Sequence, residues 1–352
     1  MEQAIIVVKG SPYEQGVEQG KRLVDLIHHN TEIIRTKLRE AKCDNERYWD
    51  FVERNVLFMK ERHRELYDEM RGIADGSGMP FKDILMINIP AYFLTEQLRQ
   101  ECTMLLARGK ATLDGKTYVI KNRDMGMDVR QVVIHHIYDD GTSIVEVNGA
   151  GIVTYPASGM SSHGLGVTTT GFWSAKAPTA MDRVDAAQIF MNVHLILANC
   201  RTAREALEYI KTTPCMNGLS IIVVDEHDAY VLEMTNDGYV LQEDDGSGIL
   251  FRSNHYMTDE LKHLNPDPAK FTSTYFRAKR VDELLKESYG KLRFQDFFRI
   301  LSDHKDGINC LCRHPQGEVL GRTVSTSMFV LEDREAWTSL GNPCMNLRFA
   351  KL

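Results

Sequence analysis

The sequence lacks a long uninterrupted run of apolar residues. No stretch approaches the ~18 consecutive apolar residues that a membrane-spanning helix requires. The N-terminus has only the short run AIIVV at residues 4–8, without a basic region before it or a small-residue cleavage site after it. Such a segment is not a secretory signal peptide. We therefore expect a cytoplasmic protein that does not contact a membrane.

An excess of basic charge and a regular set of cysteines are also missing. The chain has 42 Lys and Arg against 49 Asp and Glu, giving a net charge of −7 with the two signs interspersed. A nucleic-acid-binding domain usually has a basic stripe, so no nucleic-acid partner is expected. Seven cysteines, an odd number at irregular spacing, do not form a disulfide framework. We interpret them as reduced thiols.

The patterns that are present change near residue 102. Helical periodicity dominates the first hundred residues, and short strand-like runs separated by turns follow. This order predicts one compact α+β domain with antiparallel sheets covered by helices and a helical N-terminal block. The predicted helices are 23–38, 46–73, 81–98, 183–197, 202–211, 270–287 and 294–302. The predicted strands are 5–8, 103–107, 117–121, 132–138, 143–147, 219–225, 229–234, 239–242, 325–331 and 336–339, followed by a short tail at 346–349.

Most cysteines show no sign of chemistry in their local sequence. Cys310 and Cys312 lie close to His304 and His314, but Cys-x-Cys is not the usual Cys-x2-Cys spacing of a zinc site. We therefore predict no metal there. Apart from Cys102, the other four are interpreted as small buried apolar side chains: Cys43, Cys200, Cys215 and Cys344.

Cys102 differs because it stands where the helical pattern gives way to strands. The strand after it turns at 114–115, an Asp-Gly pair, and the next strand returns to Asp124. A hairpin brings the far ends of its two strands together, so Asp124 is expected near Cys102. A thiol with a returned carboxylate is a candidate nucleophile. A papain-like Cys–His pair is an alternative that would need a histidine placed beside the thiol by the fold.

Several short motifs occur in one order along nearly the whole chain. With them the sequence resembles the acyl-coenzyme A:isopenicillin N acyltransferase family, cysteine N-terminal nucleophile (Ntn) hydrolases related to choloylglycine hydrolase. The motifs are GSPYEQGVEQGKRL (10–23), MRGIADGSG (70–78), ECT (101–103), NRD (122–124), GMSSHGLGV (159–167), SNH (253–255), 322–332 and LGNP (340–343). Their order is more specific than any single motif.

The resemblance implies a four-layer αββα sandwich of two antiparallel sheets. It also implies a precursor that cleaves itself between Glu101 and Cys102. The products would be a helical segment, 1–101, and a chain of residues 102–352 that stays associated with it. The new α-amine of Cys102, with a pKa of about 7.7–8.0, could then act as the local base for the thiol.

The same resemblance implies roles for individual residues. Cys102 would be the nucleophile, Asp124 would orient its amine, and Asn254 would donate to the oxyanion. Arg322 would stabilise charge near the nucleophile or orient its partners. Ser161 stands where relatives commonly carry an oxyanion asparagine.

Two further positions depart from the relatives. Lys121 stands where bile salt hydrolases have an arginine, which favours the acyltransferase branch. Glu101 stands where the acyltransferase commonly has glycine, next to the predicted cleavage point.

The expected function is thus an autoprocessing amidohydrolase or acyltransferase with an acyl-Cys102 intermediate. Its substrate would be a small-molecule amide or an acyl-thioester such as acyl-coenzyme A, and no cofactor or metal is expected. Water or an amine would take the acyl group, and the sequence does not separate the two. A catalytically silent, unprocessed binding protein of the same fold is the main alternative. A homo-oligomer is left open.

Overall fold

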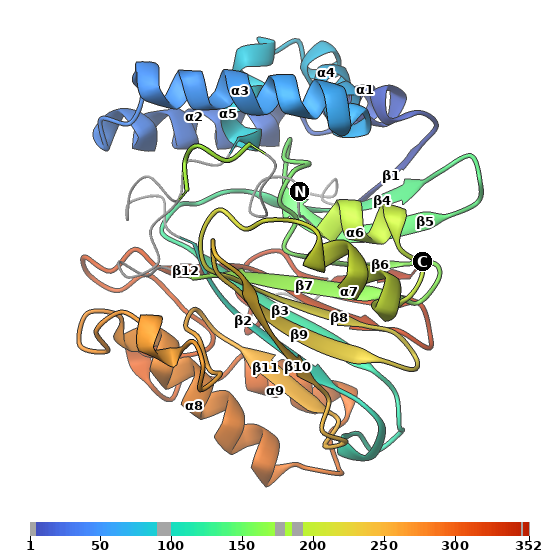
Figure 1. The fold of residues 1–352 in the computed structure, drawn as a ribbon, viewed down its shortest axis with the longest axis vertical. Helices are drawn as coiled ribbons and strands as arrows, with labels where there is room; N and C mark the ends of the chain where they lie inside the picture. The colour runs from blue at the N-terminus through green and yellow to red at the C-terminus, as the bar shows by residue number, and fades with distance from the viewer. Residues whose placement is uncertain (1–4, 90–99, 173–179, 185–192, 346–347, 352) are drawn as a thin grey trace.

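Two β-sheets stacked face to face form the centre of the molecule, and helices cover their outer faces (Figure 1). The computed structural model describes residues 5–89, 100–172, 180–184, 193–345 and 348–351. The architecture is α+β, as predicted, and its helical N-terminal block lies at one end of the sandwich.

The first sheet has eight strands, in the order β1-β4-β5-β6-β7-β8-β9-β10. These are β1 (Ile5–Lys9), β4 (Gln131–Ile137), β5 (Ser143–Gly149), β6 (Ser158–Ser161), β7 (Gly166–Gly171), β8 (Leu219–Val224), β9 (Ala229–Met234) and β10 (Tyr239–Glu243). Neighbouring strands are antiparallel except β1 and β4, which are parallel. The expectation of purely antiparallel sheets is therefore corrected at this edge. The long helical segment between the two strands is a connection that permits parallel pairing.

The second sheet has six strands in the order β11-β2-β3-β12-β13-β14, all paired antiparallel. These are β11 (Ile249–Arg252), β2 (Gln100–Ala107), β3 (Tyr118–Met125), β12 (Arg322–Val330), β13 (Glu335–Ser339) and β14 (Arg348–Lys351). The predicted hairpin is present, because β2 pairs with β3 over its whole length. It places the candidate nucleophile on a central strand.

An apolar layer fills the space between the two sheets. Met104 and Leu106 of β2 and Val119 of β3 face this layer and meet Val145 and Ile222 of the larger sheet. All five side chains are essentially buried. Alternate residues of a strand point to opposite faces, so the neighbours of these residues in β2 and β3 face the other way, toward helices.

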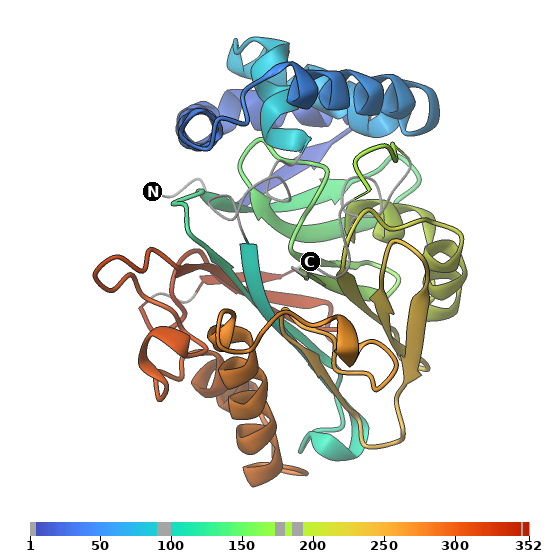
Figure 2. The ribbon, with the colours of Figure 1, turned by 60° about the vertical axis from the view of Figure 1, so that its left-hand side comes forward.

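Helices complete four layers. On the eight-stranded sheet lie α6 (Val193–Asn199) and α7 (Ala203–Lys211), and on the six-stranded sheet lie α8 (Thr272–Glu287) and α9 (Phe294–Leu301). Figure 2 shows α8 and α9 on the outer side of the strands that include β2 and β3. The predicted αββα order is confirmed.

Five helices make the N-terminal block, which packs on β1 and β4. They are α1 (Pro12–Arg22), α2 (Val24–Glu40), α3 (Glu46–Arg62), α4 (Arg64–Ser77) and α5 (Phe81–Asn88). The motif at 10–23 begins with a capping box, in which Ser11 and Glu14 bond each other's backbone nitrogens. The first motif thus begins this block, and the second, 70–78, lies in α4 and its C-terminal end.

The glycines of those two motifs allow α1 and α4 to touch backbone to backbone. A Cβ atom added to Gly16 would overlap the carbonyl oxygen of Glu69, and one added to Gly72 would overlap that of Tyr13. Only glycine permits so close an approach. Helix packing therefore explains the glycine spacing.

Some predicted elements differ from the structure. The predicted helix 46–73 is two helices, because the backbone at His63 (φ −133°, ψ 57°) leaves the helical region. The short strands β6, β7 and β11 were not predicted. Gly and Ser in β6 (SGMS) are typical of turns, and β11 (ILFR) is only four residues long. Parts of the predicted helices 81–98 and 183–197 and of the tail 346–349 lie outside the described residues. Among the helices described, none is long and apolar enough to cross a bilayer.

Candidate active site

Cys102 lies on β2 with its side chain between the two sheets. It pairs with Arg123, and Met104 pairs with Lys121. Directly paired residues share a face, so Cys102 and Lys121 both face the eight-stranded sheet. Cys102 is 4% exposed. The hairpin register that the sequence left open is thereby defined, and it gives the thiol a buried setting next to β7.

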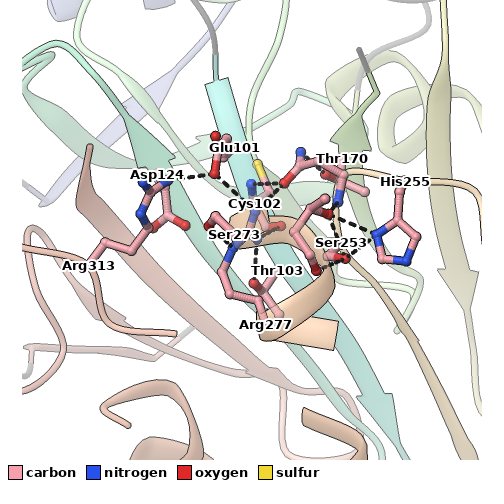
Figure 3. A network of polar contacts seen from close by, with 12 residues as sticks. Glu101, Cys102, Thr103, Asp124, Thr170, Ser253, His255, Ser273, Arg277 and Arg313 are labelled. Atoms are coloured by element: carbon pink, nitrogen blue, oxygen red, sulfur yellow. Dashed lines mark hydrogen bonds and ion pairs between the residues drawn. The ribbon is translucent and has the colours of Figure 1, made fainter. Parts of the chain in front are cut away.

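The backbone of Cys102 is held at both polar atoms. Its nitrogen donates a hydrogen bond to Asn254 Oδ1 at 2.8 Å. Its carbonyl oxygen accepts from Nη1 of Arg277, which also donates to Thr103 Oγ1 at 2.8 Å. Figure 3 shows Arg277 reaching up from α8 toward β2. The peptide unit of the candidate nucleophile is therefore bound by groups from two other elements.

Asn254 is itself held in one orientation. Its Nδ2 donates to Thr170 Oγ1 at 2.8 Å and to the carbonyl oxygen of Gly171 at 2.7 Å. Its Oδ1 accepts from Arg277 Nη2 at 2.8 Å as well as from Cys102. Acceptors surround the amide nitrogen and donors surround the oxygen, so Asn254 acts as an acceptor for the nucleophile's nitrogen. The donor role toward an oxyanion, which the resemblance implied, would require Nδ2 to leave Thr170 or Gly171.

Lys121 is a buried cation beside the thiol, 3% exposed. Its Nζ donates to the carbonyl oxygens of Ala157, at 2.9 Å, and Thr169. Burial lowers the pKa of Lys121 to about 8, although the charge of the Cys102 thiolate and a hydrogen bond to it act in the opposite direction. Sequence reasoning noticed Lys121 only as a departure from relatives. Lys121 lies two residues along β3 from Arg123, the strand partner of Cys102. This position in the register indicates that the Lys121 side chain is on the same face as the thiol.

Asp124 lies on the opposite face of the sheet from the Cys102 side chain, across from Glu101 in the strand register. Its Oδ1 accepts from Thr323 Oγ1 at 2.7 Å, and Oδ2 has no hydrogen-bond partner among the described residues. Burial raises the pKa of the carboxyl, while the positive charges of Arg277 and Arg313 oppose that shift. The hairpin thus brings Asp124 next to the Glu101–Cys102 bond, as predicted, but not onto the thiol's side.

Two arginines hold the carboxylate of Glu101. Arg313 Nη1 lies 2.5 Å and Arg277 Nη2 lies 3.1 Å from Glu101 Oε2 (Figure 3). Arg277 is fully buried and Arg313 is 8% exposed. Sequence reasoning missed both. The available signal for Arg277 was its place in the helical pattern of α8, where Thr274, Ala278 and Val281 mark the buried face.

A cavity of about 390 Å³ opens on the Asp124 side of β2 and β3. Charged side chains of both signs surround it, so it suits a polar or zwitterionic group better than an apolar one. It is lined by Lys37, Glu40, Glu101, Asp124, Met125, Gly126, Arg313, Glu318, Leu320 and Gly321.

Arg322 begins β12 opposite Met125. Its Nη1 lies 3.8 Å from Asp128 Oδ1, and it lines a second cavity, of about 630 Å³, with Gln131. Among the described residues, the Arg322 side chain lies at this second cavity and makes no hydrogen bond or ion pair with the cluster around Cys102. The structure therefore does not bring Arg322 to the place that the resemblance implied.

Ser161 ends β6 and is buried, and its Oγ has no partner in the described part of the chain. Lys121 donates to the carbonyl oxygen of Ala157, the residue before β6, at the opposite end of the strand from Ser161. The residue after Ser161 accepts a hydrogen bond from Arg334 at the β12–β13 turn. A four-residue separation spans about 13 Å along a strand. Ser161 thus lies outside the Cys102 cluster, where Thr170 and Gly171 contact Asn254 instead.

Comparison with known proteins gives a family match over most of the chain. The model of the family described as acyl-coenzyme A:6-aminopenicillanic acid acyl-transferase matches residues 111–344. The 40 kDa form of acyl-coenzyme A:6-aminopenicillanic-acid-acyltransferase of Emericella nidulans is 24% identical over 354 residues, covering 96% of this chain and 92% of that protein. Protein dcd1A of Dictyostelium discoideum is 26% identical over 146 residues, covering 35% of this chain and 32% of that protein.

Two solved structures are also similar. A mutant of conjugated bile acid hydrolase from Clostridium perfringens is 16% identical with a TM-score of 0.45, covering 71% of this chain and 97% of that one. Penicillin V acylase from Agrobacterium tumefaciens is 12% identical with a TM-score of 0.47, covering 71% and 86%.

Proposed function

This chain belongs to the acyl-coenzyme A:6-aminopenicillanic acid acyl-transferase family, and we propose that it is an autoprocessing enzyme with Cys102 as nucleophile. One observation carries the proposal: Asn254, Arg277 and Lys121 converge on Cys102 from three different elements. A merely structural cysteine needs no such partners. The reaction class is cleavage or formation of an amide bond through an acyl-thioester.

The first step is self-cleavage before Cys102. The sulfur attacks the Glu101 carbonyl carbon, the Glu101–Cys102 C–N bond breaks, and a thioester forms between Glu101 and the sulfur. Water then releases segment 1–101 as a carboxylate and restores the thiol. Since the nitrogen of Cys102 is an amide before the cut, it cannot be the base. We assign that role to Lys121, whose Nζ takes the thiol proton and returns it to the departing nitrogen.

After cleavage the Cys102 nitrogen is an amine in the same place. Asn254 Oδ1 already accepts a hydrogen bond from this nitrogen, so it would hold the amine near the sulfur of its own residue. The amine takes the thiol proton as sulfur attacks the acyl carbon, and gives it to the departing amine or thiol of the substrate. Water or an amine then takes the acyl group from Cys102.

The relative supports the proposed substrate class. The name of the Emericella nidulans relative pairs an acyl-coenzyme A with an amine. The charged cavity beside Glu101 and Asp124 lies on the opposite face of the sheet from the thiol, so it is not proposed as the binding site of the acceptor. We therefore propose a small-molecule acyl-thioester or N-acyl amine as donor, and an amine or water as acceptor.

The test is the mass of the purified protein combined with labelling by a thiol-directed acylating probe. We expect fragments 1–101 and 102–352 and one label on Cys102. The Cys102→Ala variant should stay a single unlabelled chain. Cys200→Ala, which removes another buried thiol, should process normally. A wild-type chain that stays whole and still turns over N-acyl substrates would contradict the mechanism.

One observation favours a second candidate, an unprocessed binding protein. Glu101 and Cys102 are consecutive residues of a strand that pairs with β3 throughout, and two arginines hold the Glu101 side chain. A chain that stays whole, takes no acyl label and retains a small molecule through purification would support this alternative.

A further inference from the structure

Four metal-ligating side chains meet on the far side of the six-stranded sheet from the thiol of Cys102. Their ligand atoms all lie within 4.8 Å of one another: His304, Cys312, His314 and Cys344. They come from separate segments. His304 follows α9, Cys312 and His314 lie between the 3-10 turn Gly307–Asn309 and β12, and Cys344 follows β13.

The separations among these atoms are those of a tetrahedral site. Bonds of about 2.3 Å to sulfur and 2.0–2.1 Å to nitrogen place two sulfurs about 3.8 Å apart, two nitrogens about 3.3 Å apart, and a sulfur about 3.6 Å from a nitrogen. Here the sulfurs of Cys312 and Cys344 are 3.6 Å apart, and the Nε2 atoms of His304 and His314 are 3.1 Å apart. The Nε2 of His314 lies 3.7 Å from Cys312 Sγ and 3.3 Å from Cys344 Sγ.

We propose that these four side chains bind a Zn²⁺ ion. Two thiols and two imidazoles are a donor set that zinc prefers, and four protein ligands leave no open position, which is typical of a structural site. Binding releases the two thiol protons, and the two thiolates then neutralise the ion's charge. The Nε2 atoms of the two imidazoles lie 3.1 Å apart. A bound ion explains this short distance, because each nitrogen can direct its lone pair at the same ion.

The surroundings suit a bound thiolate. Asn342 Nδ2 donates to Cys312 Sγ at 3.4 Å and to the carbonyl oxygen of Arg313 at 2.6 Å. Hydrogen bonds from such outer groups orient metal ligands and support their charge. Cys310, two residues from Cys312, instead donates its thiol to the carbonyl oxygen of Cys312. It therefore stands outside the four ligands.

The ion would connect two parts of the chain near the candidate active site. It would tie the segment between α9 and β12 to the segment after β13. Arg313, which stands between two of the ligands, reaches Glu101 with its side chain. The zinc site would thus stabilise the segment that contains Arg313. The proposal of a zinc site does not depend on the activity proposed above.

The spacing rule did not identify this cluster because it looks for ligand pairs along the sequence. Cys344 is 30 residues from His314 and 32 from Cys312, and only the fold brings it to them. The prediction that this cysteine is an ordinary buried apolar residue also differs from the structure, in which Cys344 is exposed.

The test is metal content by mass spectrometry on full-length protein purified in reductant without a metal-affinity step. We expect one zinc per chain, and cobalt substitution should give the intense visible absorption of a tetrahedral thiolate site. In chelator competition, Cys344→Ser and Cys312→Ser should weaken binding more than ~100-fold, beyond what outer-group changes typically cause. Cys310→Ser is the matched control and should keep the metal.

Cys344→Ser changes an exposed side chain, so its folding, checked by circular dichroism, separates metal loss from misfolding. A reduced wild-type chain that takes up neither zinc nor cobalt would overturn the proposal. So would metal that survives in both serine variants, or a Cys312–Cys344 disulfide in a second preparation made without reductant, detected by intact mass. Intact mass also shows whether the chain is cut before Cys102. Zinc binding can therefore be judged independently of self-cleavage.

Discussion

Asn254 accepts a hydrogen bond from the backbone nitrogen of Cys102, 152 residues away in the chain, at a distance of 2.8 Å. The same oxygen accepts from Arg277, and the amide nitrogen of Asn254 is occupied by β7. Asn254 therefore links the nucleophile's strand to the neighbouring sheet. Its first effect on the reaction is to position the nitrogen that becomes the amine.

Asn254→Ala should slow acylation of Cys102 by ~100-fold, because a misplacement of a reacting group by about 1 Å can cost about that much. The pH dependence of acylation should also shift, since the amine loses its acceptor. Stopped-flow measurement with an activated acyl-thioester gives both. Asn199→Ala, which removes a partly buried amide on α6, is the control. An unchanged pH profile with a lower rate would indicate the oxyanion role instead.

Lys121→Met should slow self-cleavage by a factor of ~10²–10⁴, the usual contribution of a general base. Lys121 must be neutral to accept the thiol proton. The wild-type cleavage rate should therefore rise as pH increases through about 8, the pKa of Lys121. Pulse–chase of freshly translated chain, from pH 6.5 to 9.5, measures this. The control is Lys110→Met, which changes a lysine in a 3-10 turn away from the thiol and should leave the self-cleavage rate unchanged. Equal self-cleavage rates in the two variants would exclude Lys121 as the base.

Arg277→Ala should destabilise the fold by about 1–3 kcal/mol, because it leaves buried acceptors without a donor while Glu101 keeps Arg313. The carbonyl of Cys102 and the carboxylate of Glu101 each lose a donor. Urea unfolding measures the change in free energy. Lys279→Ala, on the exposed side of the same helix, should stay within about 0.5 kcal/mol of wild type. A loss of under 1 kcal/mol at Arg277 would mean that water replaces its contacts.

A second buried network should make stability depend on pH. Glu146 lies between His194, at 3.0 Å, and His136, at 3.4 Å, and Tyr138 contacts the other nitrogen of His194 at 3.2 Å. Burial alone would lower the pKa of His194, but the Glu146 charge and hydrogen bond raise it from 6.5 to about 9. Burial alone would raise the pKa of Glu146, but the charge on His194 and the imidazole hydrogen bonds lower it from 4.5 to about 2.

The sign follows from linkage. The raised pKa of His194 gives stability that is complete below pH 6.5 and is lost as pH rises through 9. The lowered pKa of Glu146 gives stability that is complete above pH 4.5 and is lost as pH falls through 2. Urea midpoints should therefore be highest between pH 4.5 and 6.5 and fall toward pH 9. Glu146→Gln should be less stable and lose most of the decline between pH 6.5 and 9. A parallel decline in this variant would assign it to other groups.

The local sequence was sufficient for the two strands that carry Cys102 and Asp124. Short β-type runs predicted β2 and β3, and the Asp-Gly turn predicted that they pair, so Asp124 was expected near Cys102. Both are short-range properties of the chain. The helical break at His63 was not predicted, because the apolar pattern continues through that residue.

The amino-acid sequence by itself determined most of the element types, the hairpin and the change of character at Cys102, because these depend on neighbours within a few residues. The tertiary structure alone decided which face of the sheet Cys102 and Lys121 share, that Arg277 and Arg313 hold Glu101, and that Cys344 completes a group of four ligands. Those contacts join residues far apart in the chain. They exist because burying the apolar layer between the sheets sets how the sheets and helices stack, and no local pattern records that stacking.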